Sequence, residues 1–311
     1  KNSGWLDGLN DTVMTEDIRG EFAKGYLDQM ITDKQGNIIG VPGYAGYLAF
    51  WVNQKILDEA GIDKLDTKED FKKYMLAVSK DGRYGYGGSW EKTYVFNEIA
   101  QFVNMFGGDY FDWTRPENKE AIQFLYDMVQ NKQTPIDQIA DKYEQMNPKA
   151  NDGKYGCWFM WGLGTDYEKA GMLGQDKIHM AMVPSMTNDG KRAIFTDSWS
   201  YVLNTASKNK DAAIKFLKYM ASEGGMEASY KAFDRYPARK DGAEKVVPDT
   251  DPAKEMYSRY ASECKVQGRP MLPQTMEFIT DMGTIYQSCM KGEISVDEFC
   301  KKAQELVNKY K

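Results

Sequence analysis

The sequence is poor in the side chains that usually carry catalysis or bind metals. It has 311 residues but one histidine, His179, and four cysteines, Cys157, Cys264, Cys289 and Cys300. No CxxC pair is present and His179 has no metal-ligand spacing to a cysteine, so we expect no metal site and interpret His179 as a satisfied strand residue. No G-x-S-x-G motif, cysteine–histidine set or zinc motif occurs either, so acid–base chemistry would rest on carboxylates alone.

Basic blocks and long apolar runs are also missing. The formal net charge is -6, from 40 Lys and Arg against 46 Asp and Glu, which argues against nucleic acid and anionic membranes as partners. No segment reaches the roughly 18 apolar residues that a membrane span needs. No signal peptide or lipobox-like cysteine lies near Lys1, so we expect a processed or trimmed chain.

Aromatic residues, by contrast, are plentiful. They make up 13% of the chain, with 7 Trp and 20 Tyr. Such a composition suits a protein that stacks on flat ligands, although core packing also accounts for many aromatic side chains. The length is comfortable for two lobes.

Residues 33–61 organise the rest of the chain. An apolar run, Ile38–Val41, is stopped by Pro42, and a second run, Leu48–Val52, carries no charge. Uncharged runs of this kind predict strands that are buried on both faces of an α/β sheet. Asn53 then predicts the N-cap of a helix over Gln54–Ala60, which ends at Gly61.

The loop between the two strands, Gly43–Tyr47, contains two tyrosines and two glycines. In α/β sheets ligands bind in the crevice at the ends of strands. Tyr44 and Tyr47 offer flat apolar faces with hydroxyls, while glycine lets a ligand approach the backbone. An ordinary surface loop with aromatic plugs is the alternative explanation.

This part of the sequence resembles the extracellular solute-binding proteins of ABC importers. The resemblance rests on the stretch G-N-I-I-G-V-P, the aromatic loop after it, and the stretch W-V-N-Q-K-I-L-D-E-A-G-I. More narrowly, this part of the sequence resembles the maltose-binding-protein-like carbohydrate class of these proteins, and the resemblance continues to the C-terminus. It implies an α/β, two-lobed, type II periplasmic-binding-protein-like fold, with a ligand cleft between lobes that are joined by crossing strands near residues 46, 197 and 252.

The same resemblance sets the expected domains. The N-terminal lobe would comprise 1–46 and 198–252, and the C-terminal lobe 47–197 and 253–311. Relatives begin with a strand and about two βα units before the segment that matches Lys1 onwards. We therefore expect the first strands of the N-terminal lobe to be absent from this chain.

Site residues follow from the loops that face the ligand in this class. The strand Tyr84–Tyr86 runs into Gly87-Gly88 and then Trp90, and the helix after it offers free N–H groups at its N-terminus. Relatives carry G-x-W after the strand that here ends at Met160, which makes Trp161 the strongest candidate, while Trp158 is expected in the core. The expected stacking residues are Tyr44, Tyr47, Trp90, Trp161 and Trp199, and the other expected ligand contacts are Glu91, Tyr94, Asn97, Asp197 and Arg235.

Some of these assignments have alternatives. For Trp199, the geometry of a crossing strand would also explain a buried side chain without a ligand. Cys289 and Cys300 flank a turn between two predicted helices, so they either bridge in an oxidising compartment or are simply buried on helix faces.

Together these features predict a binding protein and not an enzyme, with no cofactor. The resemblance implies an extracytoplasmic monomer, a periplasmic protein or surface lipoprotein, that captures an oligosaccharide by aromatic stacking and hinge closure and delivers it to a membrane permease. A polyamine or other cationic solute is the alternative ligand, since aromatic boxes with carboxylates also suit amines. A glycoside-acting enzyme would need only two carboxylates across a cleft, but no motif marks a pair. A scaffold protein would show no cleft and no closure.

Overall fold

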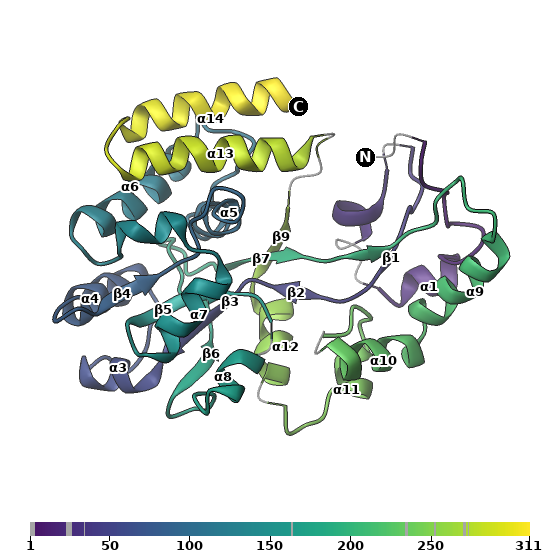
Figure 1. Ribbon diagram of the computed structural model, residues 1–311, viewed down its shortest axis with the longest axis horizontal. Helices are drawn as coiled ribbons and strands as arrows, with labels where there is room; N and C mark the ends of the chain where they lie inside the picture. Colours follow the sequence, from purple (N-terminus) through teal and green to yellow (C-terminus); the bar gives the residue numbers. More distant parts are fainter. Residues whose placement is uncertain are drawn as a thin grey trace. The chain divides into compact units, whose positions relative to one another are not determined.

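The computed structural model describes residues 4–22, 27–33, 35–162, 164–233, 236–251, 253–269, 272 and 274–311. The chain divides into two compact units (Figure 1). Unit 1 comprises Lys1–Tyr47, Thr196–Ser258 and Gly268–Pro273, and unit 2 comprises Leu48–Phe195, Arg259–Gln267 and Gln274–Lys311. The third boundary falls at Ser258, inside a helix, and not near residue 252, so 253–258 and 268–273 belong with unit 1.

Unit 2 is built on a four-stranded sheet with the order β4-β5-β3-β6. Strand β4 (Tyr84–Gly87) is parallel to β5 (Tyr155–Met160), whereas β3 (Ala49–Asn53) is antiparallel to both β5 and β6 (Ile178–Ala181). Every residue of β3 and β5 is buried. The uncharged run Leu48–Val52 therefore correctly predicts a strand, β3, that is covered on both faces.

Helices surround this sheet. They are α3 (Gln54–Glu59), α4 (Lys68–Val78), α5 (Phe96–Met105), α6 (Pro116–Gln130), α7 (Tyr143–Asn151), α8 (Thr165–Lys169), α13 (Thr275–Met290) and α14 (Val296–Tyr310), with a 3₁₀ turn at Ile136–Ala140. All ten residues of α5 are buried, so this helix lies in the core of the unit. Figure 1 shows α13 and α14 side by side, and both pack against α6.

Local signals place the starts of several helices. The Asn53 side chain accepts a hydrogen bond from the Ile56 N–H and begins α3, as the sequence predicts. Thr67 and Asp70 form a reciprocal capping box at the start of α4. Such caps satisfy backbone N–H groups that have no partner within the helix.

Unit 1 contains shorter strands. Strand β1 (Val41–Pro42) pairs with β8 (Ser200–Tyr201), and β2 (Gly46–Tyr47) pairs with β7 (Ala193–Asp197). A three-stranded sheet has the order β2-β7-β9, where β9 is Lys265–Gly268. Residues 193–195 of β7 and 265–267 of β9 belong to unit 2. The helices associated with this unit are α1 (Glu16–Gly20), a π-helix at Leu27–Ile31, α9 (Lys210–Ala221), α10 (Glu223–Phe233), α11 (Gly242–Val246) and α12 (Ala253–Glu263).

The core of unit 1 combines residues from both ends of its sequence. Leu9, Val13 and Phe22 pack with Leu217 of α9 and Met226 of α10. Among the described residues, no helix has both the length and the apolar character required to cross a membrane.

Candidate functional site

Three of the predicted ligand-binding residues meet around one tyrosine hydroxyl in unit 2. The Trp161 indole N–H donates to the Tyr143 hydroxyl at 2.8 Å, and the Asn97 amide donates to the same oxygen at 3.1 Å. The ring of Tyr94 lies edge-on to the Tyr143 ring, with centroids 5.0 Å apart and planes at 82°. We call these four residues the Tyr143 cluster.

Different elements bring the members of the cluster together. Trp161 directly follows β5, Asn97 is in the first turn of α5, and Tyr143 is the first residue of α7, which packs against β5. Beyond Trp161 the backbone turns through Gly162, whose φ of +95° lies in the left-handed region that favours glycine. The sequence places the candidate Trp161 at the end of β5, but it gives no local sign that Tyr143 would join it.

Charged groups lie beside the cluster. Glu91 accepts hydrogen bonds from the backbone and hydroxyl of Thr93. Burial raises the pKa of Glu91, but the hydrogen bonds from Thr93 and the positive charge of Lys142 outweigh it and hold the pKa below its ordinary value. The Lys142 ammonium lies 5.6 Å from the centroid of the Tyr94 ring. The half-buried aromatic faces of the cluster thus lie beside the ionised carboxylate of Glu91 and the ammonium group of Lys142.

A buried carboxyl group supports the loop that carries these residues. Glu98 of α5 accepts hydrogen bonds from the Tyr86 hydroxyl, from the Ser89 backbone N–H at 2.8 Å and from the Trp90 indole N–H at 3.0 Å. Burial raises its pKa to about 7, although the hydrogen bonds from Tyr86, Ser89 and Trp90 act in the opposite direction. Glu98 therefore joins β4 and the following loop to the first turn of α5.

The prediction that Trp90 stacks on a ligand is contradicted by the structure. Its side chain is 0% exposed and packs edge-on against Tyr286 at 5.3 Å. The reason is Glu98, which draws the indole N–H into the core of unit 2. Trp158 is buried in β5, as the sequence predicts.

Two predicted aromatic residues lie in unit 1, near β2. Tyr44 is half-buried, and its backbone carbonyl accepts a hydrogen bond from the Ser198 hydroxyl. The Tyr47 ring lies 5.1 Å from Tyr257, which in turn lies 4.3 Å from Tyr236. Tyr257 is a partner that the sequence does not indicate, because it lies on α12, more than 200 residues along the chain.

Asp197 and Trp199, also in unit 1, have contrasting surroundings. Asp197 forms an ion pair with Arg269 at 2.9 Å and accepts a hydrogen bond from the Ser198 N–H. Burial raises the pKa of Asp197 above its ordinary value, against the opposing effects of Arg269 and Ser198. Trp199 is 78% exposed. The predicted residue Arg235 lies outside the described residues.

Cys289, Cys300 and His179 are singled out by the sequence, and the structure shows the burial and bonding of each. Cys289 and Cys300 are both buried free thiols, so the bridge considered above is absent and burial on helix faces is the correct alternative. His179 lies in β6, where burial lowers its pKa. Its Nδ1 has no hydrogen-bond partner in the described part of the chain, so it is not the fully satisfied residue that we expect. Among the residues described, no group of three or more metal-ligating side chains lies together.

Comparisons with known proteins agree on a family. The model of the bacterial extracellular solute-binding proteins matches residues 1–227. An arabinooligosaccharide-binding protein of Halalkalibacterium halodurans is 27% identical over 228 residues, which cover 68% of this chain and 48% of that protein. The chain thus spans about half the length of that curated relative.

Solved structures show the same fold. Maltose-bound MalE3 of T. maritima is 18% identical, covers 99% of this chain and 81% of its own, and superposes with a TM-score of 0.81. A Thermotoga lettingae ABC transporter solute-binding protein with bound alpha-D-tagatose is 21% identical, with the same coverages and a TM-score of 0.82. The fold is that of the type II periplasmic binding proteins. The family model matches well over half of this chain, so the chain belongs to the bacterial extracellular solute-binding proteins.

Proposed function

We propose that this chain is the substrate-binding protein of an ABC importer, and that it captures an oligosaccharide outside the cytoplasm and delivers it to a membrane permease. The observation that carries the proposal is the Tyr143 cluster, which gathers residues indicated by the sequence from three separate elements. The sugars named with its relatives, an arabinooligosaccharide, the disaccharide maltose and the monosaccharide tagatose, support a carbohydrate ligand.

The chemistry of the cluster suits a sugar. A pyranose or furanose ring has an apolar face that packs on the flat rings of Trp161 and Tyr94, while Asn97 and Glu91 bond hydroxyl groups. In unit 1, Tyr44, Tyr47 and the exposed ring of Trp199 stay candidate contacts. Enclosure of the sugar between two lobes, hinge closure, a monomeric state and lipid anchoring stay predictions.

A polyamine is the second ligand that the sequence allows, but the charges disfavour it. A polyamine site needs two or more ionised carboxylates along a slot. Among the described candidates, Glu91 is ionised, whereas Asp197 is already paired with Arg269. The carboxylate Glu98 is enclosed in the core by three donors. These surroundings favour a neutral ligand and binding without catalysis.

The proposal can be tested by isothermal titration calorimetry on the whole chain, with arabino- and malto-oligosaccharides, monosaccharides and polyamines. We expect saturable binding of one oligosaccharide class. Trp161→Ala should weaken it by about 2 kcal/mol, or roughly 30-fold, through the loss of a large stacking face. The matched control is Trp5→Ala, because Trp5 is 72% exposed and belongs to unit 1.

Urea unfolding of each variant would show that it remains folded. Binding of polyamines alone would replace the sugar by the cationic alternative. If the Trp161 and Trp5 variants bind the sugar equally strongly, the Tyr143 cluster is not part of the sugar site. Turnover of an oligosaccharide would contradict the assignment as a binding protein.

A further inference from the structure

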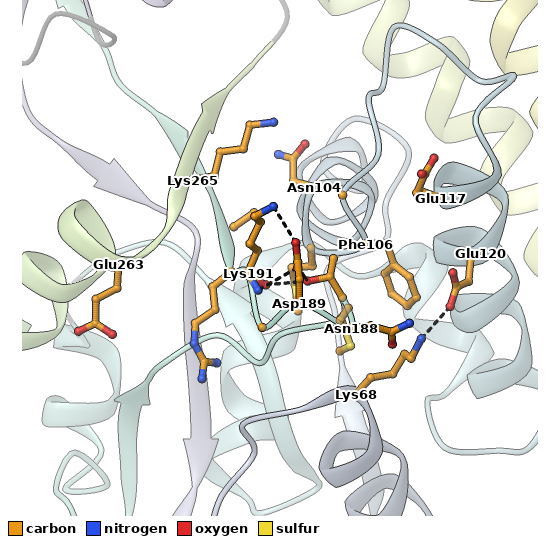
Figure 2. Close-up of a pocket in the computed structure, with 17 residues that line it drawn as sticks. Lys68, Asn104, Phe106, Glu117, Glu120, Asn188, Asp189, Lys191, Glu263 and Lys265 are labelled. Carbon is orange, nitrogen blue, oxygen red and sulfur yellow. Dashed lines mark hydrogen bonds and ion pairs between the residues drawn. The ribbon is translucent and has the colours of Figure 1, made fainter.

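Unit 2 contains a pocket that shares no residue with the Tyr143 cluster (Figure 2). Its volume is about 1080 Å³. The C-terminal end of α5, the loop 186–192 and Lys265 of β9 line it. Asn97 and Asn104 stand near opposite ends of α5, roughly 10 Å apart along the helix axis at 1.5 Å per residue. The pocket is therefore a separate feature of the same unit.

An unsatisfied buried amide marks this pocket. The Asn104 side chain is 3% exposed, and neither its nitrogen nor its oxygen has a hydrogen-bond partner in the described residues. The other buried polar side chains of α5 are satisfied: Asn97 and Glu98 as described above, and Gln101 by the backbone of Ala193 and Phe195. Buried polar groups without partners are rare because desolvation costs free energy that no hydrogen bond returns. Asn104 thus offers a donor and an acceptor that have no partner among the described residues.

Among the charged side chains that line the pocket, Lys265 has no oppositely charged partner in the described residues. Most charged lining residues are paired: Lys68 with Glu120, Lys191 with Asp189, Glu117 with Arg115, and Glu263 with Arg259. Arg192 donates to the Val183 carbonyl at 2.7 Å. The Lys265 ammonium has no ion pair or hydrogen bond within the described part of the chain. Figure 2 shows the polar ends of Lys265 and Asn104 on the same side of the pocket.

Apolar side chains complete the lining. Met105, Phe106 and Met186 are each at most 4% exposed and provide a wall without hydrogen-bonding groups. Most of the other lining side chains are polar or charged, so the pocket suits a small polar molecule better than an apolar one. The polar groups then determine which molecule is recognised.

We propose that this pocket is a second ligand site and that it takes a small hydroxycarboxylate, such as a sugar acid. The Lys265 ammonium attracts the carboxylate. A hydroxyl group both donates and accepts, so it satisfies the oxygen and the nitrogen of the Asn104 amide together. The site goes beyond the proposed sugar site and does not depend on it.

Calorimetry on the whole chain tests this proposal with gluconate as the probe. Glucose, which lacks the carboxylate, and inorganic phosphate, which lacks the hydroxyl-bearing carbon chain, are the comparison ligands. We expect saturable binding of gluconate, at least tenfold weaker binding of glucose and phosphate at this site, and at least a tenfold loss in both Asn104→Leu and Lys265→Met. Lys72→Met is the matched control, because Lys72 is an exposed lysine of α4 outside the pocket.

The folded state and the sugar site are checked separately. Asn104→Leu should unfold at the same or a higher urea concentration than the parent chain, because the amide it replaces has no hydrogen-bond partner in the described part of the chain. It should also keep the oligosaccharide affinity, whereas Trp161→Ala should keep the gluconate affinity. Absence of gluconate binding, equal binding of glucose or phosphate, or unchanged binding in the Asn104 and Lys265 variants would each overturn the proposal.

Discussion

Replacing Tyr143 by phenylalanine removes a single oxygen atom from the centre of the candidate sugar site. That oxygen accepts hydrogen bonds from the Trp161 indole at 2.8 Å and from the Asn97 amide at 3.1 Å. Phenylalanine keeps the ring that packs edge-on against Tyr94. The substitution therefore isolates the two hydrogen bonds from the packing.

The expected magnitude follows from the number and burial of these bonds. A hydrogen bond within a protein contributes about 0.5–1.5 kcal/mol net, because water competes for the same groups. Asn97 is 5% exposed and loses a partner that water replaces poorly, whereas Trp161 is half-buried. We expect Tyr143→Phe to lower the free energy of unfolding by about 1–2 kcal/mol. Oligosaccharide affinity should fall about tenfold, because the Trp161 ring is no longer held in one orientation.

Urea unfolding, followed by circular dichroism and tryptophan fluorescence, measures the first effect, and calorimetric titration measures the second. Tyr126→Phe is the matched control, because Tyr126 is a half-buried tyrosine of α6. Its hydroxyl has no hydrogen bond to another described residue. A Tyr143 variant that matches this control in both stability and affinity would refute the view that the hydroxyl organises the site.

Three further substitutions test other parts of unit 2. Glu98 keeps its proton up to about pH 7 in the folded chain but ionises near 4.5 when unfolded. The free energy of unfolding should therefore fall by about 3 kcal/mol as the pH rises between these values and then level off, and Glu98→Gln should lose this dependence in urea titrations across pH 4–8; an equal slope in both proteins would contradict the raised pKa. Thr67→Ala should lower the free energy of unfolding by about 1 kcal/mol at neutral pH, because the cap that Thr67 shares with Asp70 is lost; an unchanged urea midpoint would show that the cap is not needed. Gly283→Ala places a methyl group 2.1 Å from the Lys92 carbonyl oxygen, so calorimetry should show a lower melting temperature and a cost of about 1–3 kcal/mol, whereas a higher one would mean that α13 moves without strain.

The sequence by itself determined the features that depend on near neighbours. The uncharged run at 48–52 forms the fully buried strand β3, and Asn53 begins the helix that follows it. Thr67 and Asp70 form a capping box three residues apart. These features could be predicted because a cap or a strand pattern is decided by residues within one or two turns of each other.

Only the tertiary structure decided which candidate residues meet. Trp90 follows two glycines, as an exposed loop residue would, yet it is buried because Glu98 on the next helix accepts its N–H. The Tyr143 hydroxyl unites Asn97, 46 residues before it, with Trp161, 18 residues after it. Contacts over such separations depend on how β5, α5 and α7 pack. No local pattern encodes them, because a side chain carries the same chemistry whether its partner is brought to it by the fold or not.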